Sequence, residues 1–113
     1  MDILDPQILK ELQDSAGADF VAELLQTFLE DAPPLLAELQ RAQAAGDAAA
    51  FKRAAHTLKS NGHTFGAVEL STLARELELS PLPTLGEQAA PRLAALAQAY
   101  ERAATALKAM NHG

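Results

Sequence analysis

The chain has 113 residues, no cysteine and a formal net charge of −6. Its length suits one domain with one modest core, and the lack of cysteine excludes disulfides and thiolate metal sites. An acidic chain without a large basic surface is a poor partner for nucleic acid, and no apolar run approaches the roughly 20 residues of a membrane span. The N-terminal stretch lacks the features of a signal peptide, so we expect a cytoplasmic protein without membrane insertion.

The N-terminal part of the chain is predicted to form short helices. Asp5 suits a helix N-cap and Pro6 suits the first helical position, so a helix should begin there. A second helix follows, with apolar side chains at helical spacing. The pair Pro33-Pro34 should stop this helix and open a third, because proline lacks the backbone N–H that a helix interior needs.

The later boundaries are marked by glycine and turn residues. Gly46 can adopt the left-handed conformation of a helix C-cap, and Asp47 can N-cap the next helix. Gly66 ends that helix or forces a tight turn, and the residues SPLPTLG predict a loop over 80–86. The expected helices therefore cover residues 5–14, 19–31, 33–45, 47–65, 67–79 and 86–110.

Short connections between the last four helices predict antiparallel neighbours. No strand pattern, repeat or linker interrupts the chain. The expected fold class is all-α, an antiparallel four-helix bundle with one or two extra N-terminal helices covering one end. The whole chain, 1–113, should form this single domain, as a monomer.

His56 is predicted to face solvent. On a helical wheel of residues 47–65 the apolar side chains form one face almost opposite His56. Three of the nine basic residues lie within 52–59, and no carboxylate occurs between Asp47 and Glu69. The residues within about 60° of His56 on its own side are Lys52, Arg53, Lys59, Ser60 and His63.

Several roles for His56 can be compared. Its solvent-facing position disfavours a core histidine, whereas a solvated polar stripe stays open. Metal binding is disfavoured because His56 and His63 lie about 10 Å apart along the helix and cations surround them, so no metal site is predicted. Catalysis by this chain alone needs an orienting group, and no carboxylate is local in sequence.

An exposed imidazole among cations on a rigid helix suits the acceptance of a phosphoryl group. Imidazole is largely neutral and nucleophilic near pH 7, and Lys59, with Lys52 or Arg53, can offset the charge of the product. A partner protein can supply the donor carboxylate and Mg²⁺, so no cofactor of its own is expected.

The stretch His56-Thr57-Leu58-Lys59-Ser60-Asn61-Gly62, with Gly66 following, resembles the signature of histidine-containing phosphotransfer (HPt) domains. That signature is H-x-L-K-G-S-S with a glycine ten residues after the histidine. The resemblance implies that His56 is the phosphoacceptor and that Lys59 lies beside the phosphoryl group. Ser60 stands where glycine is usual and Asn61-Gly62 replace small hydroxyl residues. Ser60, Lys52 and Arg53 are further phosphate-supporting candidates, and the structural motif residues are Leu58, Gly62 and Gly66.

The resemblance also implies a relay without kinase or nucleotide-binding activity. Such a domain takes phosphate from an aspartate on a receiver domain and passes it to another receiver. The expected partners are response-regulator receiver domains, which bring the Mg²⁺, and a hybrid sensor histidine kinase. Candidate docking residues are Phe20, Leu24, Phe28 and His63, although the first three suit a core equally well.

Two other classes of function stay open. One is a helical module that docks a receiver or sensor kinase without taking phosphate. The other is an enzyme or metal protein built on the bundle. The presence of both His56 and Lys59 favours the relay, because a domain that only docks would be expected to lose one of these residues.

Overall fold

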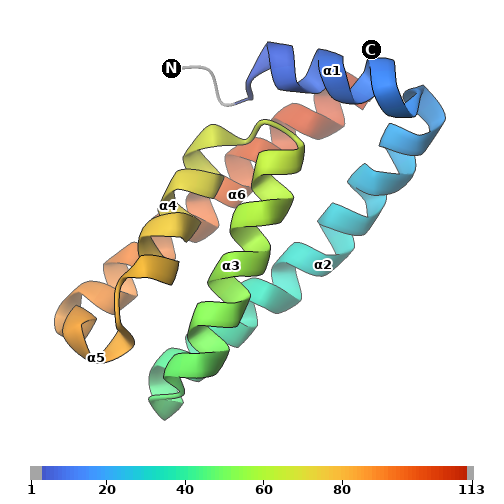
Figure 1. Cartoon of the computed structure of the whole chain (residues 1–113). Helices are drawn as coiled ribbons and strands as arrows, with labels where there is room; N and C mark the ends of the chain where they lie inside the picture. Colours follow the sequence, from blue (N-terminus) through green and yellow to red (C-terminus); the bar gives the residue numbers. More distant parts are fainter. Residues whose placement is uncertain (1–3, 112–113) are drawn as a thin grey trace.

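The computed structural model describes residues 4–111, and within them every regular element is helical. α2, α3, α4 and α6 form an antiparallel four-helix bundle, and α1 crosses one end of it (Figure 1). The predicted fold class is therefore confirmed. The elements are α1 (Pro6–Ala16), α2 (Ala18–Ala45), α3 (Ala48–Thr64), α4 (Val68–Leu79), α5 (Leu82–Leu85), the 3₁₀ turn η1 (Gly86–Gln88) and α6 (Ala89–Asn111).

α2 is one continuous helix, so the predicted break at Pro33-Pro34 is wrong. Its 28 residues, at 1.5 Å each, span about 42 Å, which equals the longest dimension of the molecule. Both prolines are exposed, so water can bond to the carbonyls that they leave without a donor. Ala32 and Leu39 on the opposite face are fully buried, and this packing carries the helix through the prolines.

The consequence is that the first bundle helix begins at Ala18 rather than near residue 33. The helix predicted over 19–31 is the N-terminal half of α2, and α1 alone crosses the end of the bundle. Tertiary packing has outweighed the local preference of proline, whose cost in a helix interior is about 3 kcal/mol.

Two further boundaries follow from capping and burial. Gly46 has φ 71°, and its N–H bonds to the carbonyls of Ala42 and Gln43, as predicted for a C-cap. The Asp47 side chain accepts a hydrogen bond from Ala50 N at 3.1 Å and caps α3. The predicted loop over 80–86 instead contains α5, because its two leucines are buried against the bundle, and the last helix begins at Ala89 rather than at 86.

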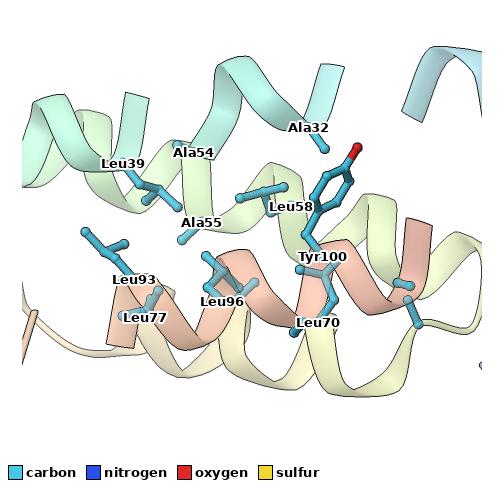
Figure 2. Close-up of a cluster of buried hydrophobic side chains, with 14 of the residues drawn as sticks. Ala32, Leu39, Ala54, Ala55, Leu58, Leu70, Leu77, Leu93, Leu96 and Tyr100 are labelled. Atoms are coloured by element: carbon cyan, nitrogen blue, oxygen red, sulfur yellow. The ribbon is translucent and has the colours of Figure 1, made fainter. Parts of the chain in front are cut away.

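Leucine and alanine fill the centre of the bundle (Figure 2). Ala54 and Ala55 of α3 are almost fully buried, and their small side chains let neighbouring helices approach closely. At the end near α1, the centroid of the Phe28 ring lies 5.3 Å from that of Phe65 and 5.5 Å from that of Tyr100. Within residues 4–111, no helix has the length and hydropathy that a bilayer crossing requires.

α1 closes this aromatic end of the core. Leu4, just before α1, and Leu9 within it are buried. Beneath Leu9 lies a hollow of about 200 Å³, lined also by Leu25, Phe65 and Leu107. The N–H of Asp5 donates to the carbonyl of Gly66 at 2.7 Å, which ties the segment before α1 to the turn between α3 and α4.

Candidate functional site

His56 projects from the outer face of α3. Its neighbours Ala55 and Leu58 are fully buried, whereas the His56 side chain is 58% exposed. The predicted solvent-facing position is therefore confirmed. Because the inner face of α3 is packed, the imidazole is held on a rigid backbone and not on a loop.

A carboxylate from α4 reaches the histidine. Glu78 Oε1 lies 2.8 Å from His56 Nδ1, and Glu78 Oε2 lies 2.8 Å from Lys59 Nζ. The Lys59 contact is an ion pair that lacks the alignment of a hydrogen bond. Since the Glu78 side chain is only 13% exposed, the carboxylate fills the space between the two helices and joins His56 to Lys59.

The charge of Glu78 fixes the role of each imidazole nitrogen. Lys59 first, and then His56, hold the pKa of the Glu78 carboxyl below its ordinary value of 4.5, so it is ionised at neutral pH. An ionised carboxylate can only accept a hydrogen bond, so His56 Nδ1 must be the donor. In the neutral ring the lone pair then lies on Nε2, which makes no hydrogen bond to another residue within 4–111.

The sequence prediction missed Glu78, because this carboxylate lies 22 residues from His56 along the chain. The symmetry of the hairpin could have identified it. α3 and α4 run antiparallel around a turn at Gly66-Ala67, so residues equally distant from the turn lie opposite one another. His56 and Glu78 are each 11 residues from Ala67, since 67 − 56 = 11 and 78 − 67 = 11.

The predicted cations lie on both sides of His56. Lys52 and Arg53, both exposed, line a hollow of about 620 Å³ together with His56 and Glu78. On the other side Lys59 is partly buried, and Ser60 is exposed one turn beyond His56. The structure therefore gathers the predicted phosphate-supporting residues around one ring. In the part of the chain that the structure describes, no three His, Asp or Glu side chains lie close enough to hold a metal ion.

The three predicted structural residues determine how closely the chain packs around α3. Leu58 is fully buried in the core. A Cβ on Gly62 would lie 3.3 Å from Ser71 N, so glycine permits the close crossing of α4. Gly66 has φ 68° and its Cβ position is 3.0 Å from Asp5 O, so the turn requires glycine for both conformation and space.

The predicted docking residues differ in exposure. Phe20 is 51% exposed in the first turn of α2, and Leu24 is half-buried. Phe28 is only 3% exposed, because its ring packs within the core, so its prediction as a docking residue is wrong. His63 is exposed on the same face of α3 as His56 and lines a different hollow.

The comparisons with known proteins agree on one family. Residues 23–110 match the family model described as Hpt domain. The chain is 39% identical over 79 residues to the Sensor protein TorS of Escherichia coli (strain K12), which covers 70% of this chain and 9% of TorS. It is 36% identical over 75 residues to Histidine-containing phosphotransfer protein 2 of Arabidopsis thaliana, which covers 62% of this chain and 48% of that protein.

A solved structure is also similar over nearly the whole chain. The crystal structure of histidine-containing phosphotransfer protein B (HptB) from Pseudomonas aeruginosa PAO1 aligns with a TM-score of 0.87 and 28% sequence identity. The alignment covers 97% of this chain and 95% of HptB. By contrast, the chain spans less than half the length of the two curated relatives.

Proposed function

This chain belongs to the Hpt domain family of phosphorelay intermediates in two-component signalling, and we propose that His56 is the residue that accepts and releases its phosphoryl group. One observation carries the proposal. The exposed His56 ring donates from Nδ1 to the mostly buried carboxylate of Glu78, 2.8 Å away, which leaves the Nε2 lone pair available as the nucleophile.

The proposed donor is an aspartyl phosphate on a receiver domain. The lone pair of His56 Nε2 attacks phosphorus, and an N–P bond forms. The bond between phosphorus and the aspartyl oxygen breaks, and its electron pair returns to the receiver's carboxylate. The ring gains positive charge while Nδ1 keeps its proton, and the ionised Glu78 stabilises this charge through the existing hydrogen bond. The reverse step delivers the phosphoryl group to a second receiver.

The surrounding cations would stabilise the phosphoryl oxygens. Lys59 is nearest in sequence on one side, and Lys52 and Arg53 flank the hollow on the other. Phosphoryl transfer depends mainly on positioning and on offsetting charge, so these cations suit the part of the reaction proposed for this chain. Mg²⁺ would come with the receiver, whose carboxylates suit that ion.

We also propose where this chain acts and with which partners. The chain would act without kinase or nucleotide-binding activity of its own, as a cytoplasmic monomer. Its partners would be response-regulator receiver domains and a hybrid sensor histidine kinase. The similarity to TorS, which is named a sensor protein, supports a sensor kinase as the source of phosphate.

A phosphotransfer assay tests the function. Receiver domains from the same organism are charged with labelled phosphate and mixed with the wild type, His56→Gln and His63→Gln. The matched control is His63, the other exposed histidine of α3. We expect the wild type and His63→Gln to gain acid-labile, base-stable label, and His56→Gln to gain none. Label on His56→Gln would assign the chemistry elsewhere, and binding without any label would indicate a docking module.

A further inference from the structure

A second hollow lies on the outer face of α3 and α4, beyond the contact of Lys59 with Glu78. Its volume is about 520 Å³, enough for the side chains of a partner segment rather than a single ion. None of its lining residues is acidic, although the chain carries 15 acidic and 9 basic residues. The lining consists of Lys59, Ser60, His63, Thr64, Ser71, Thr72 and Arg75.

Some of the polar groups of this hollow are already engaged. The Thr64 hydroxyl donates to the carbonyl of Ser60 at 3.0 Å, and the Ser71 hydroxyl donates to the carbonyl of Val68 at 3.1 Å. Lys59 pairs with Glu78 at the edge of the hollow.

The remaining donors face the hollow without a partner. Within residues 4–111, the side chains of Ser60, Thr72 and Arg75 make no hydrogen bond or ion pair. Arg75 and Thr72 come from α4, and Ser60 comes from α3, so free donors from two helices line one space. A guanidinium is a planar fork that matches a carboxylate in two hydrogen bonds.

The side of His56 away from this hollow differs in charge, because a carboxylate partly offsets the positive charge of Arg53 there. Arg53 lines a groove with Glu38, between α2 and α3. The pKa of Glu38 is lowered mainly by its hydrogen bond with Arg41 and, to a smaller extent, by Arg53. The hollow at Arg75 has no such carboxylate among its lining residues.

The position of the hollow indicates what will cover it. A stable interface buries about 800 Å² on each partner, a disc of roughly 16 Å radius. Lys59 is about one helical turn from His56 and His63 about two turns, or roughly 10 Å. On these dimensions, a receiver whose aspartate reached His56 would also cover the hollow and remove Arg75 from water. An unpaired charge in such an interface is unfavourable, so the partner must bring an anion.

We propose that this hollow receives a carboxylate side chain of the receiver domain, with Arg75 as its main ligand. The identity of the partner rests on the proposed phosphorelay function. The site adjoins the position of the phosphoryl group, because Lys59 lies at the edge of both, and Arg75 would determine how tightly a receiver docks and which receivers are accepted. Ser60 and Thr72 would add hydrogen bonds to the same carboxylate.

The test measures transfer from a phosphorylated receiver as a function of receiver concentration, at low and at high salt. The variants are Arg75→Glu and Arg75→Gln, and the control is Arg92→Glu at an exposed position of α6. For Arg75→Glu we expect the half-saturating concentration to rise about tenfold, with the rate at saturation within about twofold of the wild type. The half-saturating concentration of Arg75→Gln should lie between those of the wild type and Arg75→Glu, and that of Arg92→Glu should match the wild type.

The salt dependence and direct binding complete the test. Salt should raise the half-saturating receiver concentration of the wild type, and it should have less effect on that of Arg75→Glu. Equal concentration dependence for Arg75→Glu and Arg92→Glu would overturn the docking site while leaving the relay intact. A lower rate at saturation alone would place Arg75 at the phosphoryl group instead.

Binding of unphosphorylated receivers separates the two proposals. If receivers bind the wild type without labelling it, and Arg75→Glu weakens that binding, the docking site stands and the relay function fails. If no receiver either labels or binds the wild type, both proposals fail. Circular dichroism of each variant checks that the helices are unchanged.

Discussion

Glu78 illustrates how one residue can prepare another for chemistry. It is mostly buried, whereas the ring that it orients is mostly exposed. Burial fixes the carboxylate in place, and ionisation makes it an acceptor only. An amide at the same position could either donate or accept, so it would bond to His56 without selecting a tautomer.

We predict that Glu78→Gln slows phosphoryl uptake by His56 about tenfold, equivalent to about 1.4 kcal/mol in the activation free energy. The reason is that Nε2 would be protonated in part of the population and the positive ring would lose its counter-charge. Rapid-quench transfer kinetics measure the rate, and ¹⁵N NMR of the imidazole measures the tautomer. Glu76→Gln, an exposed position on the same helix, is the control. An unchanged tautomer in Glu78→Gln would contradict this role.

A second prediction concerns the titration of Glu78. Its pKa is lowered in the folded protein, so its interactions contribute stability above the ordinary value of 4.5, and this contribution is lost as the pH falls through the lower folded value. Lys59→Met removes the largest cause, so the midpoint of Glu78 should rise toward 4.5, as measured by ¹³C NMR of the carboxyl carbon. Lys52→Met should leave the midpoint in place, because Lys52 makes no ion pair within residues 4–111. A midpoint that does not move in Lys59→Met would show that Lys59 is not the cause.

At the scale of helices, the sequence predicts boundaries that depend on local capping, but it does not predict features that depend on packing between helices. The caps at Gly46 and Asp47 use groups within a few residues of one another, so the sequence alone identifies them. The continuity of α2 through Pro33-Pro34 depends on apolar contacts with other helices, which a local pattern does not contain. Glu78 escaped prediction for the same reason, since it meets His56 only across the α3–α4 hairpin.

The prolines of α2 should limit its stability. Pro34→Ala restores an N–H that can donate to the carbonyl of Glu30, four residues earlier, so we expect the free energy of unfolding to rise by about 1 kcal/mol. The gain falls short of the full proline cost because alanine also frees the unfolded chain. Urea denaturation measures it. Pro81→Ala, outside any helix interior, should give no increase, and a destabilised Pro34→Ala would contradict the expectation.

At the scale of the whole molecule, the turn at Gly66 joins the functional hairpin to the N-terminal segment. The sequence predicted a constrained glycine there, but not its contact with Asp5, which lies about sixty positions away along the chain. Most of the exposed site was predictable because one helix supplies it. The contacts between distant segments required the fold.

Gly46 and Gly66 have similar φ angles, so substitutions at the two positions can measure the contribution of this contact to stability. Gly46→Ala meets no atom within 4 Å, so it should cost only the strain of a positive φ, about 1 kcal/mol in the free energy of unfolding. Gly66→Ala adds a clash with the Asp5 backbone and should cost about 2–3 kcal/mol. Urea midpoints of the two variants provide the comparison. Equal losses in the free energy of unfolding would show that the segment around Asp5 moves aside without a measurable loss of stability.

The slight attachment of α1 has a consequence for how the native state opens. Leu9 is the one buried side chain of α1, and the Asp5–Gly66 hydrogen bond ties the start of the helix to the bundle. Its amide hydrogens should therefore exchange with solvent as a group, well before those of α3, by detachment of this helix from an intact bundle. Each such opening bares the end of the core formed by Leu25, Phe65 and Leu107. That surface is the point from which self-association of the folded protein would start.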